Sequence, residues 1–376
     1  MKMNILICCE FFYPSVGGAQ KVCEELAYNF LKRGHKVTVA TSRFNKKLKK
    51  NEIKKNIKIK RFEIRGNLIR GIKGEKKSYQ NFLLKNKFDI VFIYAAQQWT
   101  FDLIFPIIDQ IEAELFFAPC GFSKLNSTFY KSYYLKLPKI LKKFKVNILH
   151  SENYIDTMFF KRNKIQNKVF IPNAADLPSK KLVTQHKHSS SEIFKITNIS
   201  NIRPAKGQDI AMLVYFFSNL KQKSKLIIYG NNTGSKIYYC YLKILKFLIE
   251  FFYSNKSVDF VKNENRKNTI SQFYHSDIFL FTSRLECSPL VLFESASAGL
   301  PFLSTNVGNA REIANWTNCG YVESNFFNLI KRLNKMIKNK KLLENMSIQG
   351  RKNIIRYYNW NIISEKYLKV FQKYKS

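Results

Sequence analysis

The chain has few acidic residues, and this shortage is its most unusual bulk property. Its 376 residues include 26 Asp and Glu against 64 Lys and Arg, which gives a formal net charge of +38 at pH 7. Such a surplus predicts attraction to polyanions, whether nucleic acid, anionic lipid or a phosphorylated substrate. The chain is also rich in Lys, Asn, Ile and Phe, so coding bias is an alternative source of the charge. Basic residues crowd two segments of the first half, 43–77 and 131–145.

Long apolar runs, paired cysteines and histidine clusters are also missing. No run of about 18 uncharged apolar residues occurs, which argues against a membrane-spanning helix. The seven cysteines form no C-x-x-C pair and the five histidines show no ligand spacing, so we expect reduced core thiols and no metal site. The N-terminal apolar run has little basic lead and is interrupted by Glu10, which favours a first strand over a signal peptide. We therefore expect a cytoplasmic protein, with peripheral attachment at the inner face of the plasma membrane left open.

Residues 277–312 contain the pattern around which the rest of the chain is organised. An apolar run at 278–282 is followed by a polar loop, a helical segment and a second apolar run that ends before Gly308. The order of strand, loop, helix, strand and loop is half of a doubly wound α/β sheet. In such sheets ligands bind beyond the carboxyl ends of the strands, so the loops 283–290 and 306–310 should face one crevice.

Side chains near the first of these loops suit a nucleotide sugar. Ser288 is placed to cap the helix and Pro289 to occupy its first turn, so free backbone N–H groups and the positive end of the helix dipole would seat a phosphate. Glu286 lies in the loop and Glu294 about one and a half turns inside the helix. Carboxylates accept hydrogen bonds from hydroxyls, and a phosphate with sugar hydroxyls on both sides describes a nucleotide sugar.

Glu286, seven intervening residues and Glu294, followed by a small-residue helix and Gly299-Leu300-Pro301, resemble the E-x7-E signature of the retaining glycosyltransferases of family 4. Taken alone, the pair of glutamates would also fit a solvated helix face. The resemblance implies an α/β fold of the GT-B type, with two Rossmann-like doubly wound domains facing across a cleft and a C-terminal helix crossing back to the N-terminal domain. It also implies that Glu294 holds the ribose hydroxyls and that Glu286 contacts the transferred sugar.

The start of the chain carries an independent sign of a nucleotide-type fold. Apolar runs at 4–9 and 35–41 flank a helix predicted over 19–33, and Gly17 and Gly18 lie just before that helix. Backbone N–H groups can approach an anion there because glycine has no side chain, although a plain turn is the alternative. In the family an equivalent Gly-Gly loop faces the donor phosphate, so the resemblance assigns both glycines to donor binding.

Two positions depart from the family pattern. Pro119-Cys120-Gly121 follows a strand predicted at 115–118, where many family members have Pro-His-Gly with the His near the reacting centre. A neutral thiol is a poor substitute for a His donor, so it stays open whether Cys120 reduces activity. We place Cys120 and Gly121 on the acceptor side. Ala174 stands where the family's I-P-N-G turn has Gly.

Arg203 and Lys206 follow a strand predicted at 194–200. At a strand end, Arg would offer a diphosphate a fork of donors and Lys a point charge. A solvated charge pair is the default explanation, but Arg203 to Gly207 resembles the family's diphosphate motif. The resemblance therefore groups Arg203 and Lys206 with Glu286 as catalytic residues. The loops after neighbouring strands supply the other donor-binding candidates, which are Ser288, Pro289, Leu290, Val291, Gly230 and Gly308.

Two aromatic segments each have two explanations. Residues 131–145 interleave Tyr, Leu and Phe with six lysines, which fits a surface helix with its apolar face on the core or a basic amphipathic segment on anionic lipid. Residues 237–253 are rich in Tyr, Phe, Leu and Ile with few charges. We expect an interior or interdomain helix there, with a membrane-facing aromatic patch as the alternative.

The order of motifs predicts two domains. Residues 1–175, with 358–376 crossing back, would form an acceptor-side Rossmann-like domain, 176–192 a polar linker and 193–357 the nucleotide-sugar donor-binding domain. The implied function is retaining transfer of a sugar from a UDP-hexose or UDP-N-acetylhexosamine to a lipid-linked or surface-glycan acceptor in bacterial-type polysaccharide biosynthesis. No metal or other cofactor is implied.

Three alternatives stay open at this point. The acceptor could be soluble, in which case the positive charge would reflect coding bias rather than an anionic membrane partner. Cys120 and Ala174 also fit a non-catalytic nucleotide-sugar-binding subunit. A nucleic-acid-binding protein is motivated by charge alone, and we expect no nucleic-acid partner because the sequence contains no recognisable nucleic-acid module. The sugar, the nucleotide, the linkage and the oligomeric state are not specified by the sequence.

Overall fold

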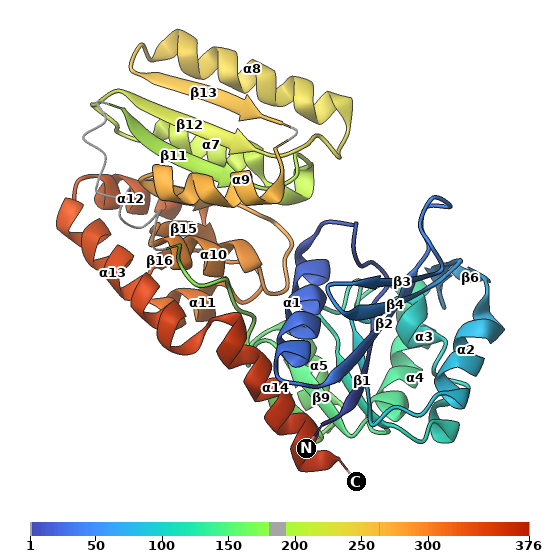
Figure 1. Ribbon diagram of the computed structural model, residues 1–376. Coiled ribbons are helices and arrows are strands. Elements are labelled where there is room, and N and C mark those ends of the chain that lie inside the picture. The colour runs from blue at the N-terminus through green and yellow to red at the C-terminus, as the bar shows by residue number, and fades with distance from the viewer. Residues whose placement is uncertain (1, 180–192, 263, 376) are drawn as a thin grey trace. The chain divides into compact units, whose positions relative to one another are not determined.

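The computed structural model describes residues 2–179, 193–262 and 264–375. Its internal contacts divide the chain into two compact units (Figure 1). Unit 1 comprises Met1–Asn173 and Trp360–Ser376, and unit 2 comprises Ala174–Asn359. The greater part of the predicted linker, residues 180–192, lies outside the described residues.

Unit 1 is built on an eight-stranded sheet with the order β10-β9-β8-β7-β1-β2-β4-β3. Neighbouring strands pair in parallel except β3 and β4, which are antiparallel. The central strands are nearly continuous apolar runs because helices cover both faces of such a sheet. The strands are β1 (Asn4–Cys8), β2 (Lys36–Ser42), β3 (Asn51–Lys54), β4 (Ile57–Phe62), β7 (Ile90–Tyr94), β8 (Glu114–Ala118), β9 (Val146–Leu149) and β10 (Lys168–Phe170), beside a separate hairpin of β5 (Ile64–Asn67) and β6 (Gly71–Gly74).

The helices of unit 1 pack on this sheet through apolar faces. The α-helices are α1 (Gly18–Lys32), α2 (Lys76–Lys85), α3 (Trp99–Asp102), α4 (Lys131–Leu141), α5 (Ile155–Arg162) and α14 (Trp360–Tyr374). Helix α14 lies against α1, where the rings of Phe30 and Phe371 are 5.8 Å apart between centroids. In α4, Leu137 and Leu141 are buried in the core while Leu135 is 72% exposed. The apolar face of the basic segment 131–145 therefore packs on the core.

Unit 2 is built on a six-stranded, wholly parallel sheet with the order β13-β12-β11-β14-β15-β16. Its strands are β11 (Phe194–Ile199), β12 (Ser224–Tyr229), β13 (Lys256–Val261), β14 (Ile278–Phe281), β15 (Phe302–Thr305) and β16 (Gly320–Glu323). Two buried clusters lie on its two faces, one including residues of α7, α8 and α12 and the other residues of α10 and α11. The helices are α7 (Gln208–Phe217), α8 (Lys236–Phe252), α9 (Arg266–Ser271), α10 (Leu290–Ala298), α11 (Ala310–Thr317), α12 (Phe326–Ile337) and α13 (Lys340–Tyr357).

Each unit is therefore a doubly wound, Rossmann-like α/β domain, which confirms the predicted fold class. In unit 2, β11 lies between β12 and β14, and in unit 1, β1 lies between β2 and β7. The order of strands reverses direction at these places, and ligands of such sheets bind where the loops diverge beyond the carboxyl ends. No helix in the described part of the chain is both long enough and apolar enough to cross a membrane.

A buried lysine caps the end of α7. Lys256, the first residue of β13, is 4% exposed, and its Nζ donates to the backbone carbonyl oxygens of Tyr215 (3.0 Å), Phe216 (2.9 Å) and Ser218 (2.7 Å). Carbonyls in the last turn of a helix have no partner within the helix. Burial lowers the pKa of Lys256 to about 8, so the ammonium form still dominates at neutral pH.

We expect Lys256→Met to lower the free energy of unfolding of this domain by about 2–3 kcal/mol, because hydrogen bonds to a charged donor are lost while the carbonyls stay buried. Urea unfolding of the whole chain would measure this change in the free energy of unfolding. Lys225→Met is the matched control, since Lys225 in β12 makes a partly exposed ion pair with Asp259 (3.0 Å) and should contribute less than about 1 kcal/mol. Equal effects of the two substitutions would contradict the capping role.

Candidate functional site

The predicted donor residues of unit 2 gather at the carboxyl edge of its sheet. Arg203 and Lys206 follow β11, Gly230 follows β12, residues 286–291 follow β14 and Gly308 follows β15. All of these strands are parallel, so their carboxyl ends meet at one edge. The strands β11 and β14 are neighbours at the point where the strand order reverses, which makes this edge the expected binding place.

Two of the predicted catalytic residues contact each other at this point. Lys206 is the last residue of a short 3-10 helix (Pro204–Lys206), and its Nζ forms an ion pair with Oε1 of Glu286, 80 residues later in the chain. The same oxygen accepts a hydrogen bond from Ser283 Oγ (2.7 Å). The side chains of Lys206 and Glu286 are only 18% and 15% exposed. The structure thus holds a cation and a carboxylate in fixed positions where the loops of β11 and β14 meet.

Close backbone approaches keep these loops in place. Gly207 has a φ of 64°, and a Cβ at this residue would lie 2.0 Å from the carbonyl oxygen of Thr282, whose hydroxyl donates to the carbonyl of Gly207 (2.7 Å). Gly308 has a φ of 55°, and a Cβ there would lie 2.3 Å from the carbonyl oxygen of Cys287. Glycine is required at both places because a side chain would be strained and would clash with backbone. The loops after β11, β14 and β15 are therefore locked together.

Glu294 and Arg203 occupy different environments at the same edge. Glu294, in the middle of α10, is 7% exposed, and its Oε1 forms an ion pair with Nη2 of Arg266 at the start of α9. The guanidinium compensates the charge of a carboxylate that is largely removed from water. Arg203 is exposed, so its guanidinium is open to solvent. Sequence reasoning missed Arg266, because it lies in a polar segment without a motif and its partner is distant in the sequence.

The start of α10 differs from the prediction. The residue in the capping position is Pro289, with no side-chain cap, and the helix begins at Leu290, so the expected capping role of Ser288 is wrong. Pro289 was expected in the first turn, but its ψ of 111° is extended and delays the helix by one residue. Leu290 is buried and Val291 partly buried. The amino end of the helix still follows the loop that carries Glu286.

In unit 1, the predicted glycines lie beyond the end of β1. Gly17 is the capping residue of α1 and Gly18 its first residue. The φ of Gly17 is 178°, an extended conformation that any residue adopts, so the backbone does not by itself require glycine there. The loop after β1 is joined to the loop after β7, because Glu10 N donates to Gln98 Oε1 (3.2 Å).

A titratable carboxyl near this edge was overlooked in the sequence, where Glu10 figured only as an interruption of an apolar run. Burial is the main cause that raises the pKa of Glu10 to about 7, and the nearby charge of Asp102 raises it further. Burial also raises the pKa of Asp102 to about 6, although its carboxylate accepts hydrogen bonds from Leu68 N (2.7 Å) and Tyr133 Oη (2.9 Å). The pKa values of Glu10 and Asp102 are therefore both raised toward neutrality at the carboxyl edge of this sheet.

Cys120 and Gly121 lie in a constrained loop after β8. Both have positive φ angles, 53° and 100°. The thiol of Cys120 donates to Tyr94 Oη (3.3 Å), and the N–H groups of Gly121 and Phe122 donate to the carboxylate of Asp156 at 2.8 and 2.6 Å. Burial raises the pKa of Asp156 to about 6 despite these two N–H donors, which lower it. Asp156 therefore holds the loop in which family members carry a His.

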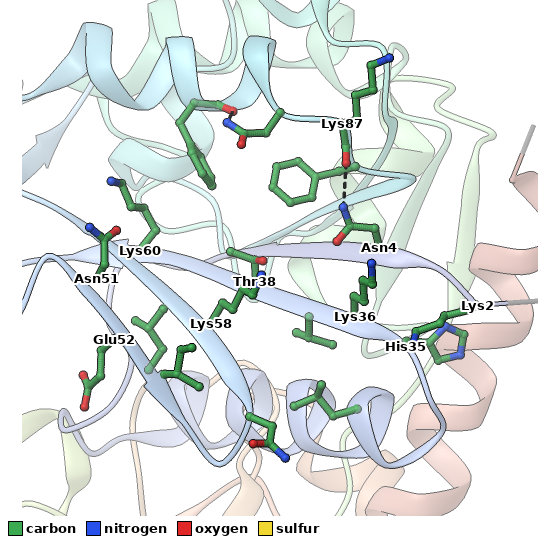
Figure 2. A pocket seen from close by; sticks show the side chains of 18 residues that line it. Lys2, Asn4, His35, Lys36, Thr38, Asn51, Glu52, Lys58, Lys60 and Lys87 are labelled. Carbon is green, nitrogen blue, oxygen red and sulfur yellow. Dashed lines mark hydrogen bonds between the residues drawn. The ribbon is translucent and has the colours of Figure 1, made fainter.

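A large cavity lies away from all of these residues. It has a volume of about 1160 Å³ and is lined near the amino ends of β1 and β2 by Lys2, Asn4, Lys36 and Lys87, together with Lys58 and Lys60 of β4 (Figure 2). Figure 2 also shows Asn4 Nδ2 donating to the carbonyl oxygen of Lys87 (2.7 Å). None of the predicted site residues lines this cavity. Among the described residues, no group of three or more His, Cys, Asp or Glu side chains is arranged to hold a metal ion.

Comparisons with known proteins bear on the fold and the family of the chain. The sequence model of a family described as "Glycosyl transferases group 1" matches residues 182–353. No curated protein is significantly similar to the chain in sequence. Among solved structures, sucrose-phosphate synthase from Thermosynechococcus elongatus is similar over 99% of both chains, with a TM-score of 0.78 and 13% identity.

Two further solved structures share the fold over almost the whole chain. WaaG, a glycosyltransferase involved in lipopolysaccharide biosynthesis, aligns over 98% of this chain and 99% of its own, with a TM-score of 0.69 and 18% identity. HepE from Anabaena in complex with UDP-glucose aligns over 99% of this chain and 100% of its own, with a TM-score of 0.73 and 15% identity. These similarities show the GT-B fold.

Proposed function

We propose that the chain is a group 1 glycosyltransferase, since the model of that family matches residues 182–353, and that it transfers a sugar from a nucleotide-diphosphate sugar with retention at the anomeric carbon and without a metal. The observation that carries this proposal is the contact between Lys206 and Glu286 where the loops of β11 and β14 meet. Lys206 belongs to the motif that resembles the family's diphosphate motif, and Glu286 belongs to the E-x7-E motif. A cation for the leaving group and a carboxylate for the sugar are thereby held side by side.

In this proposal Lys206 changes partners during the reaction. Without donor it neutralises Glu286, and with donor bound it would contact the diphosphate together with Arg203. The negative charge that develops on the departing nucleotide would then meet these two cations and the amino end of α10, at residues 288–291. Glu286 would be released to accept hydrogen bonds from the transferred sugar, and Glu294 from the ribose. Gly230 and Gly308 would line the same site, and Gly17 and Gly18 of unit 1 remain predicted donor-binding residues.

We propose an acceptor that is lipid-linked or part of a surface glycan. WaaG acts in lipopolysaccharide biosynthesis and HepE binds UDP-glucose, which supports a UDP-hexose or UDP-N-acetylhexosamine donor and a membrane-borne acceptor. The net charge of +38 supports attraction to an anionic membrane surface. Cys120 and Gly121 would lie on the acceptor side.

A screen of nucleoside diphosphates and their sugars by thermal shift, in the presence of a chelator, tests the donor assignment. We expect one nucleoside diphosphate to raise Tm, and NMR of the donor incubated with acceptor extract or water to show a product with the anomeric configuration of the donor. A product of inverted configuration would contradict retention. Binding without transfer or hydrolysis would favour the binding-subunit alternative.

A further inference from the structure

Helix α8 exposes an apolar face that the proposed donor site does not use. Leu242, Leu245 and Ile249 face the core of unit 2. The opposite side of the same helix carries large apolar side chains at intervals of three or four residues. These exposed residues, the α8 face, are Ile237, Tyr241, Ile244, Phe247, Phe251 and Phe252. Of the expected interior or interdomain helix at 237–253, the interior position is therefore wrong for this side, because the helix is apolar around most of its circumference and only part of it is buried.

The exposed rings continue beyond α8. Successive ring centroids lie 5.8 Å apart from Phe247 to Phe251, 5.3 Å from Phe251 to Phe252, and 6.1 Å from Phe252 to Phe216 of α7. A further series of contacts of 4.9–6.1 Å leads from Phe216 through Phe217 and Phe326 to Phe327. Phe247 is 64% and Phe251 71% exposed. Phe216 and Phe326 are themselves partly buried against the core, so they connect exposed rings on α8 to exposed rings on α7 and α12. A group of exposed rings of this size marks an interaction site rather than scattered apolar residues.

The exposed charges around the α8 face are mostly positive. Lys236 and Lys243 are exposed on the helix, and Lys221 and Lys223 are exposed in the segment that precedes β12. The one carboxylate of the helix, Glu250, pairs with Lys246 (3.5 Å) and accepts from Val258 N (3.0 Å). A second copy of this chain would bring another +38, so net charge opposes self-association through this face.

We propose that the α8 face seats the enzyme on an anionic bilayer, with Phe247 and Phe251 entering the interfacial region and the flanking lysines meeting lipid headgroups. A helix with a large apolar face and a lysine flank has the composition of an interfacial membrane helix. Aromatic side chains partition well into the headgroup region. This inference rests on the proposed membrane-borne acceptor, and it assigns the contact to the donor-binding domain rather than to the basic segments of unit 1.

Sedimentation with vesicles tests the proposal on the full chain. We expect wild type to bind vesicles of phosphatidylcholine with 30% phosphatidylglycerol and to bind pure phosphatidylcholine much more weakly. The double variant Phe247→Ser, Phe251→Ser should reduce binding to the anionic vesicles at least tenfold, because two exposed rings no longer enter the bilayer. Both side chains point to solvent, so Tm and the nucleoside diphosphate shift should not change.

The matched control replaces two equally exposed apolar residues of unit 1, as Phe129→Ser with Leu135→Ser. Unchanged vesicle binding in this control supports the α8 face as the membrane contact. A tenfold loss of vesicle binding in the control, with no loss in the α8 variant, would overturn the proposal in favour of the segment 131–145. A dimer in analytical ultracentrifugation that dissociates in the α8 variant, with vesicle binding intact, would also overturn it. Failure of the donor assignment is separately visible, since Glu294→Ala would then leave nucleotide binding unaltered.

Discussion

Lys206→Glu should lower kcat by about three orders of magnitude or more while the chain remains folded. The ammonium of Lys206 is in contact with Glu286 at the meeting of the β11 and β14 loops, where the leaving diphosphate is proposed to bind. Removing one donor that stabilises developing negative charge costs about 10²–10³ in kcat. The introduced carboxylate adds repulsion, both toward the diphosphate and toward Glu286. Steady-state kinetics with the donor identified by thermal shift would give kcat and KM separately.

Two further variants separate loss of the cation from repulsion. Lys206→Met should show a reduction of about 10²–10³, because it removes the charge without adding another. Lys331→Glu makes the same charge reversal at an exposed position on α12, and its kcat should stay within about twofold of wild type because distant surface charges are screened. Near-normal turnover of Lys206→Glu would refute the assignment of Lys206 to the diphosphate. A drop shared by Lys331→Glu would point instead to a general effect of net charge.

The sheets of both units could be predicted from the sequence because parallel strands covered on both faces are short, continuous apolar runs. The run 278–282 corresponds to β14 (Ile278–Phe281), and the helix predicted over 19–33 to α1 (Gly18–Lys32). Gly207 and Gly308 are also features that the sequence itself displays, since glycine is needed where backbone contacts between loops leave no room for a side chain. Periodicity and special residues are local properties, so the sequence reveals them.

Contacts between distant residues could not be predicted in the same way. Nothing local indicates that Lys206 pairs with Glu286 or that Arg266 pairs with Glu294, because each contact depends on the order of strands in the folded sheet. The shifted start of α10 has a different origin, since the conformation of Pro289 is set by the loop around it. The sequence left open whether 237–253 is an interior or interdomain helix or carries a membrane-facing aromatic patch, because an apolar side chain in a helix is compatible with either burial or exposure.

The second large effect is expected for Glu294→Ala, which should reduce the rise in Tm that a nucleoside diphosphate produces. A nucleoside diphosphate at 100 times its Kd stabilises the folded state by about 2.7 kcal/mol, which corresponds to a rise in Tm of about 5–10 °C for a domain of this size. If the carboxylate holds the ribose hydroxyls, Glu294→Ala loses charged hydrogen bonds that contribute about 1.5–3 kcal/mol. The Kd then rises about 10–100-fold, and at the same ligand concentration the shift in Tm should fall to about 1–6 °C.

The stability of the ligand-free variant decides how this result is interpreted. Glu294→Ala removes a carboxylate that is 7% exposed and leaves Arg266, whose side chain is 30% exposed and can turn to water, so the ligand-free Tm should change little. Arg266→Ala should lower the ligand-free Tm more, because it leaves a buried carboxylate without its cation. Glu344→Gln on α13 is the control, with the full ligand shift expected. If Glu294→Ala retained that full shift while turnover was lost, Glu294 would act on the reacting sugar rather than on the ribose.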